Sequence, residues 1–208
     1  MRIAPEGRWF IAAAWIIAAA LAALGWWIAF ALWLPVAIWV VAFFRDPDRG
    51  GDRGERLVLA PADGKVVSVI EVDEPAFIGD RAIRVSIFMN VFDCHVNRYP
   101  MDGVVGYRHY NPGQFGHAGT DKASLSNEQA SVGLDTARGK VLIRQIAGLV
   151  ARRIVTDHPV GTAVHQAQRL GMIRFGSRVD LFLPVGTRIL VKVGDRTLVA
   201  RTVVAEWS

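Results

Sequence analysis

The sequence predicts a mainly β fold of the α+β class: an N-terminal hydrophobic helical hairpin, then a compact, mostly antiparallel β domain with one or two short helices. Two observations carry this prediction. Residues 9–44 contain no charged side chain, which is typical of helices in lipid. The later segments are short, rich in β-branched residues and separated by Gly, Pro and Asp, which is typical of strands and turns.

The uncharged run is too long for one straight membrane helix. Its 36 residues would span about 54 Å, whereas the hydrocarbon core of a bilayer is about 30 Å thick. Gly25, followed by Trp26 and Trp27, divides the run into residues 10–24 and 28–44. Tryptophan favours membrane interfaces. We therefore predict a helical hairpin, or two helices lying partly in one leaflet, within an anchor of residues 1–44.

The charges on either side of this run predict its orientation. Arg2 and Arg8 precede it, and Arg45, Arg49 and Arg53 follow it. The positive-inside rule places both ends in the cytoplasm. A cleaved signal peptide is disfavoured because the run is too long, and because Phe43-Phe44-Arg45-Asp46 lacks the small residues that a cleavage site needs. The prediction is a protein of the cell (inner) membrane whose main domain faces the cytoplasm.

The chain beyond the anchor is predicted to be a linker, residues 45–56, and a β domain, residues 57–208. Alternating apolar patterns predict strands at residues 65–72, 82–88, 104–110 and 140–145. Residues 188–193 and 196–204 are predicted to pair as a hairpin through Gly194-Asp195. Only residues 162–170 have a helical pattern, with Gly171 as the C-terminal cap.

Composition narrows the classes of partner. Lys and Arg exceed Asp and Glu by five, which suits an anionic membrane surface or a phosphate-bearing ligand. No arginine-rich tail favours nucleic acid. A lone cysteine, Cys94, excludes an internal disulfide and a cysteine-based metal site, and the histidines lack metal-ligand spacing. We predict no metal and no nucleic acid, and the sequence leaves a homo-oligomer open.

Three positions could carry chemistry. Glycine leaves the Gly176 carbonyl accessible, so the Ser177 hydroxyl could attack it, although Gly-Ser pairs also occur in ordinary turns. His95 ends a predicted strand and could act as a general acid or base, or be structural. Asp63 lies in an Asp-Gly turn, where the usual role of Asp is to bond the backbone.

Taken together, five short motifs resemble a known family. The chain resembles the short, membrane-anchored class of phosphatidylserine decarboxylase proenzymes. The motifs occur in the order of that family: Phe-Arg-Asp-Pro at 44–47, Ala-Pro-Ala-Asp-Gly at 60–64, residues 93–100 around His95, Asn-Glu at 127–128, and Phe-Gly-Ser-Arg-Val-Asp at 175–180.

The resemblance implies a self-processing enzyme with a pyruvoyl cofactor. Ser177 would attack the Gly176 carbonyl, and elimination and hydrolysis would leave a large subunit, 1–176, and a small subunit, 177–208, with the pyruvoyl group on residue 177. His95 would be the base and Asp63 the carboxylate that orients it. The ketone would be the electron sink when CO2 leaves phosphatidylserine, His95 would return a proton, and the product would be phosphatidylethanolamine.

The sequence departs from the family pattern at one position. Larger bacterial members carry a second histidine three residues after the first, where this chain has Arg98. Either His95 serves both reactions, or His117 or His158 helps. Arg98 could face the lipid phosphate or form a surface salt bridge. Lys122 and Asn127 are further candidates for substrate binding, the alternative being a solvated surface turn.

Two functions of other classes remain as alternatives. One is a membrane-tethered, non-catalytic β domain that binds or carries a group, as in lipoyl carriers, with Lys65 as the candidate attachment point. The other is a membrane-bound serine hydrolase. The second is disfavoured because the residues around Ser177 lack the Gly-x-Ser-x-Gly pattern.

Overall fold

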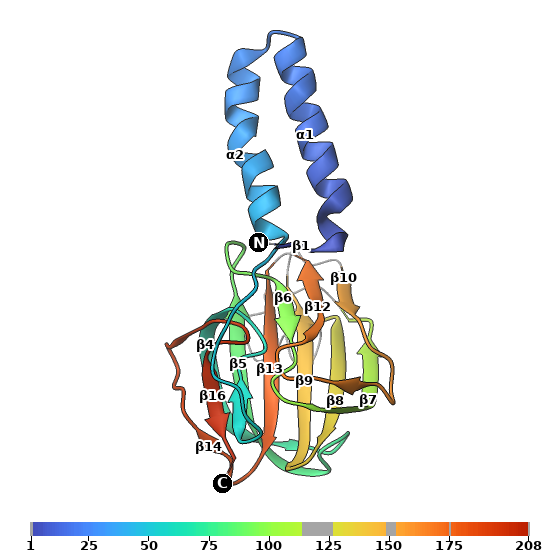
Figure 1. The fold of residues 1–208 in the computed structure, drawn as a ribbon, viewed down its shortest axis with the longest axis vertical. Coiled ribbons are helices and arrows are strands. Elements are labelled where there is room, and N and C mark those ends of the chain that lie inside the picture. Colours follow the sequence, from blue (N-terminus) through green and yellow to red (C-terminus); the bar gives the residue numbers. More distant parts are fainter. Residues whose placement is uncertain (1, 114–126, 149–152, 175, 208) are drawn as a thin grey trace. The chain divides into compact units, whose positions relative to one another are not determined.

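The computed structural model describes residues 2–113, 127–148, 153–174 and 176–207. The chain divides into two compact units, Met1–Asp48 and Arg49–Ser208. The first unit holds the helices and the second is built from strands (Figure 1). The predicted fold class is confirmed.

The first unit is a helical hairpin. A short 3-10 turn, η1 (Pro5–Gly7), leads into α1 (Arg8–Ala23), and α2 (Trp27–Phe43) returns. β1 (Arg2–Ile3) and β2 (Arg45–Asp46) pair antiparallel at its open end. Gly25 has φ +71, a left-handed conformation that suits glycine. The predicted division is therefore confirmed, and Pro5–Ala23 is long and apolar enough to cross a membrane.

The second unit is organised around an eight-stranded antiparallel sheet in the order β11-β7-β8-β9-β13-β5-β4-β15. The strands predicted at 65–72, 82–88, 104–110 and 140–145 are confirmed as β4, β5, β7 and β9. The bounds are β4 (Gly64–Glu74), β5 (Asp80–Met89), β7 (Gly103–Asn111), β8 (Gln129–Thr136), β9 (Gly139–Ala147), β11 (Ala163–Val164), β13 (Ser177–Pro184) and β15 (Arg196–Thr197).

Two three-stranded sheets complete the domain. One has the order β10-β12-β6 and the other β14-β16-β3. The main core contains apolar side chains from the large sheet and from both small sheets, such as Val179, Ile173 and Val204. The bounds are β3 (Leu57–Leu59), β6 (Val96–Arg98), β10 (Arg153–Thr156), β12 (Arg169–Arg174), β14 (Arg188–Ile189) and β16 (Val203–Glu206).

The predicted helix at residues 162–170 is wrong. The segment forms β11 and the start of β12, and Ala167 between them has φ +67, which no helix accepts. Gly171 is not a cap but lies inside β12, where a Cβ would stand 1.9 Å from the carbonyl oxygen of Val155. This glycine permits close strand pairing. None of the described residues after Asp48 forms a helix.

The predicted hairpin of residues 188–204 is also wrong. The tight turn exists, since the Asp195 amide donates to the Lys192 carbonyl at 3.1 Å and Gly194 has φ +101. The segments that flank it pair elsewhere: β14 pairs with β16, and β15 pairs with β4. Turn chemistry therefore located the reversal but could not determine the pairing partners.

Candidate active site

Ser177 is the first residue of the central strand β13. Its neighbours across the ladder are Met89 of β5 and Ala147 of β9, so both edges of the strand are paired from this residue onward (Figure 1). The Ser177 side chain is fully buried. Gly176 before it has φ +60, the left-handed region that favours glycine. The scissile bond expected from the sequence therefore lies where the chain enters the sheet.

His95 lies between β5 and β6 and is fully buried. Its Nδ1 is 3.0 Å from the carbonyl oxygen of Asp93. Because a carbonyl only accepts, Nδ1 must carry the hydrogen, which leaves Nε2 as the basic nitrogen of the neutral ring. The carbonyl of His95 accepts from the Ile173 amide at 3.3 Å, so this histidine lies beside the strand that leads to Gly176.

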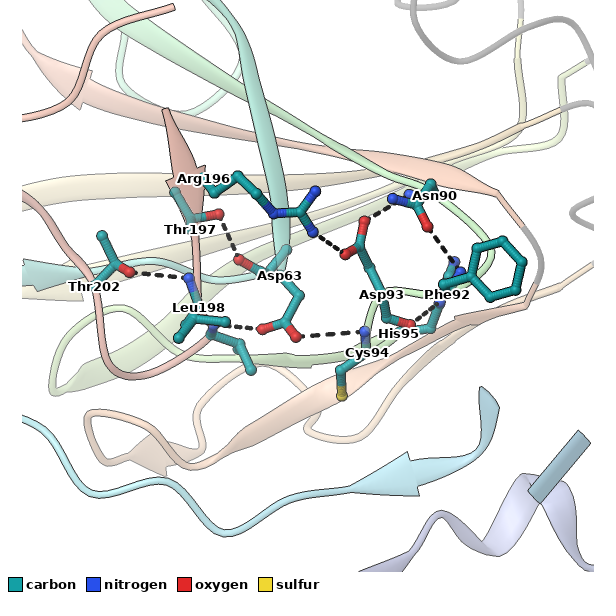
Figure 2. Close-up of polar contacts among 12 residues, drawn as sticks. Asp63, Asn90, Phe92, Asp93, Cys94, His95, Arg196, Thr197, Leu198 and Thr202 are labelled. Carbon is teal, nitrogen blue, oxygen red and sulfur yellow. Dashed lines mark hydrogen bonds and ion pairs between the residues drawn. The ribbon is translucent and has the colours of Figure 1, made fainter. Parts of the chain in front are cut away.

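The loop before His95 is held by its own polar groups (Figure 2). The Asn90 amide donates to Asp93 Oδ2 at 2.9 Å, and the Phe92 amide donates to Asn90 Oδ1 at 2.8 Å. The exposed side chain of Arg196 forms an ion pair with the Asp93 carboxylate. These contacts fix the carbonyl that sets the His95 tautomer.

Asp63 does not orient the His95 ring as the sequence led us to expect. Its buried carboxylate forms a bidentate ion pair with Arg49 and accepts from the Val199 amide at 2.7 Å. It also accepts from the Cys94 amide at 3.4 Å (Figure 2). Nδ1 of His95 instead bonds the Asp93 carbonyl. Asp63 thus acts on the backbone one residue before His95.

Arg49 is a site residue that sequence reasoning treated only as a flanking charge. Burial lowers the pKa of Arg49. The hydrogen bonds and the charge of Asp63 raise this pKa by more than burial lowers it, so the net shift is upward. The side chain stays cationic. A signal was present in the sequence, since Arg49 follows the Phe-Arg-Asp-Pro motif, but its partner lies 14 residues away.

A buried amide pair beside Ser177 was also missed. Asn97 Oδ1 accepts from Gln145 Nε2 at 2.8 Å. Asn97 Nδ2 and Ser177 Oγ both approach the Met89 sulfur, at 3.8 and 3.5 Å. Gln145 in an apolar strand, and Asn97 two residues after His95, were the available signals.

Asn127 and Glu128 are fixed near Ser177 by other contacts. The buried Asn127 side chain donates to the Ala147 carbonyl at 2.7 Å, and Ala147 faces Ser177 across the ladder. Glu128 accepts from the Tyr110 hydroxyl at 2.9 Å. Asn127 therefore supports the strand next to Ser177. Lys122 and His117 lie outside the described residues.

Arg98 and His158 make contacts away from this cluster. Arg98 donates to the Ala167 carbonyl at 3.0 Å, at the end of the β6–β12 ladder farther from His95. The two ring nitrogens of His158 lie 3.3 Å from the Tyr99 hydroxyl and 3.0 Å from the Gln168 amide nitrogen. Burial raises the pKa of Tyr99 to about 12, and the charge of Asp157 adds to this.

The opposite face of β13 carries a buried ion pair. Arg178 and Asp180 form a bidentate contact, with both N–O distances 2.8 Å. Both side chains are almost completely buried. Both residues belong to β13, so the pair compensates two buried charges within the strand that begins with Ser177.

Comparisons with known proteins agree on one family. The family model described as phosphatidylserine decarboxylase matches residues 36–205. A protein of Symbiobacterium thermophilum named phosphatidylserine decarboxylase proenzyme is 50% identical over 166 residues, covering 79% of this chain and 77% of that protein. Proteins of the same name from Rickettsia africae and Aromatoleum aromaticum are each 46% identical, over 171 and 168 residues. The matches cover 80% of this chain, and 74% and 78% of those proteins.

Proposed function

The chain belongs to the phosphatidylserine decarboxylase family, and from this premise we propose that it is a precursor that cuts itself between Gly176 and Ser177. The enzyme class expected from the sequence is confirmed by the family. The mature protein would convert phosphatidylserine to phosphatidylethanolamine and CO2, for phospholipid biosynthesis. The buried Ser177 that follows a left-handed Gly176 is the observation that carries this proposal.

The first step is attack by Ser177 on its own backbone. A bond forms between Oγ of Ser177 and the carbonyl carbon of Gly176, and the peptide bond between these residues breaks. A hydroxyl is a weak nucleophile at neutral pH and needs a base. Nε2 of His95 would take the Oγ proton and pass it to the departing amide nitrogen. The tautomer set by Asp93 supports this role.

The second step makes the cofactor. A base removes the α-proton of residue 177, the Cβ–Oγ bond breaks, and Gly176 leaves as a carboxylate at the end of chain 1–176. Water then replaces the nitrogen of residue 177, which departs as ammonia, and a pyruvoyl group remains on chain 177–208. When formed, this ketone supplies the electron sink for loss of CO2.

The residues around position 177 fit such a group. The position is enclosed, and β13 is paired on both edges, so the new end of the small subunit stays in the sheet. Asn127 steadies Ala147 beside it. His95, adjacent to β12, would return the proton to the former α-carbon of the lipid headgroup.

We further propose that residues 1–44 anchor the protein in the membrane and that residues 57–208 form the catalytic domain. Residues 45–56 would link the anchor to this domain. A diacyl lipid is confined to the bilayer, so tethering the domain there shortens the search for substrate. One N-terminal apolar helix of sufficient length supports membrane association. Arginines on both sides of the hairpin support a cytoplasmic location of the domain.

The intact mass of purified protein tests the function. The wild type should give two fragments that break after Gly176, the smaller with a blocked N-terminus, and Ser177→Ala should remain one chain of 208 residues. Ser86→Ala is the matched control, because Ser86 is equally buried on neighbouring β5, and it should still be cut. A wild-type chain that decarboxylates phosphatidylserine while uncut would refute the proposal.

A further inference from the structure

An amide bridge passes over the start of the central strand. β13 lies between β5, which carries Met89, and β9, which carries Gln145. Asn97 from the overlying β6 contacts both, at 3.8 Å to the Met89 sulfur and 2.8 Å to Gln145 Nε2. All of these side chains and that of Ser177 have no exposed surface. The bridge therefore spans the strand at the residue that becomes reactive.

The contacts determine which way each amide points. The Met89 sulfur can only accept, so Asn97 must present its NH2 group to it and its Oδ1 to Gln145. Gln145 must then present its own NH2 group to Asn97, because two carbonyl oxygens would repel each other. Oε1 of Gln145 is left as the atom of the bridge that points away from Asn97.

This oxygen has an unmet acceptor capacity. This oxygen is fully buried, and it has no hydrogen-bond partner among the described residues. A buried acceptor without a donor costs free energy, so native structures rarely keep one without a reason such as catalysis or binding. The natural complement is a ligand with an N–H or O–H group.

Gln145 is placed to meet a ligand at residue 177. It faces Val179 directly across the β9–β13 ladder, and Ala147 faces Ser177, so Gln145 and Ser177 are diagonal neighbours on one face. Such pairs are about 7–8 Å apart and lie within reach of long side chains. A headgroup that brings its amino nitrogen to position 177 would come within reach of the Gln145 side chain.

We propose that Gln145, held by Asn97, is the hydrogen-bond acceptor for the amino group of the serine headgroup. The inference rests on the proposed role of Ser177 and adds the residue that recognises the amine. A neutral acceptor suits this role, because a carboxylate would stabilise the ammonium form and raise the pKa of the amine. The amine must lose a proton before it can react.

Gln145→Leu removes the acceptor and tests the inference. Self-cleavage, measured by intact mass, should be unchanged. Binding of soluble dihexanoyl-phosphatidylethanolamine to the cleaved enzyme, measured by calorimetry, should weaken about tenfold, the effect of one lost hydrogen bond to a charged group. Binding of dihexanoyl-phosphatidylcholine should stay within about twofold, because its quaternary nitrogen has no N–H to donate.

Gln129→Leu is the matched control. Gln129 is also buried and faces Ile146 across the β8–β9 ladder, so it lies on the other face of the sheet from Gln145. This variant should bind both lipids as the wild type does. Equal losses for the two lipids in Gln145→Leu, or no loss for either, would overturn the inference.

Gln145→Glu keeps the shape of the side chain and remains a test if the leucine variant does not fold. A carboxylate beside the amine should shift the rising limb of the pH–rate profile to higher pH, and an unshifted profile contradicts the inference. If self-cleavage fails in both variants, Gln145 is a residue of the processing step, and this result also overturns the inference. If instead the wild type is not cut after Gly176, the proposed function itself fails.

Discussion

Replacing Asp63 by alanine should destabilise the precursor severely. The carboxylate is buried, and the Arg49 side chain it pairs with is only 17% exposed. Removing one partner of a buried ion pair costs about 3–5 kcal/mol, because the other charge is left uncompensated. The amides of Val199 and Cys94 also lose their acceptor, at about 1 kcal/mol each. We expect a loss of about 5–7 kcal/mol in the free energy of unfolding.

Part of the stability lost in Asp63→Ala should come from its ion pair with Arg49. Arg49→Met leaves the carboxylate with its two amide donors, so it should cost less, about 2 kcal/mol. The double variant should be more stable than the sum of the single changes predicts, with a coupling energy of about 2 kcal/mol. Urea unfolding followed by circular dichroism measures each value, with Ser177→Ala in every variant so that the chain stays in one piece.

Asp63→Asn distinguishes this structural role from a chemical one. The asparagine keeps an oxygen for the Val199 amide but loses the charge that pairs with Arg49. If Asp63 acts through the backbone, self-cleavage should slow only as far as stability falls. A variant of native stability that cleaves about a hundredfold more slowly would refute this reasoning, and would restore Asp63 as the residue that tunes His95.

Four further outcomes are expected. His95→Gln should slow self-cleavage by about a hundredfold or more in a timed gel assay, the scale of general base catalysis; normal cleavage would remove His95 from the mechanism. The pKa of Tyr99 is raised from 10 to about 12, so its contribution to stability is present below pH 10 and lost as pH rises to 12. The stability difference between wild type and Tyr99→Phe in urea unfolding should shrink over that window. Gly171→Ala should lower the free energy of unfolding by about 3 kcal/mol or more, because its Cβ would overlap the Val155 carbonyl. Deleting residues 1–44 should spare self-cleavage, seen by mass, more than decarboxylation of phosphatidylserine in vesicles; equal activity on vesicles would leave the anchor only a localising role.

The elements that follow simple periodicity were predictable from the sequence. The helical hairpin and the long strands β4, β5, β7 and β9 appear close to their predicted positions, because each carries its pattern in its own residues. Residues 162–170 show where this fails. Their spacing resembles a helix, but the bend at Ala167 and the pairing of β12 with β10 and β6 are tertiary effects. No local pattern encodes them.

The candidate site was predictable in its residue types but not in its contacts. Asp63 and His95 were recognised together, and a carboxylate near a histidine predicts a triad. In the structure, the His95 ring instead bonds a backbone carbonyl, and the Asp63 carboxylate pairs with an arginine. Arg49, Asn97 and Gln145 come from three distant segments. Their roles depend on burial and register, which a single sequence does not reveal.

The proposed cut lies where the chain passes from one sheet to another. β12, which ends at Arg174, belongs to a three-stranded sheet, whereas β13, which begins at Ser177, belongs to the eight-stranded sheet. The chain therefore changes sheets between Arg174 and Ser177. After the cut, β12 would stay paired with β10 and β6, which all belong to the large subunit.

The new end at residue 177 would stay in place. The ladders to β5 and β9 hold it, and β16 pairs with β3 of the large subunit. The small subunit should therefore remain bound after cleavage and separate only in denaturant, as gel filtration of the cut protein would reveal; its release under native conditions would contradict this account.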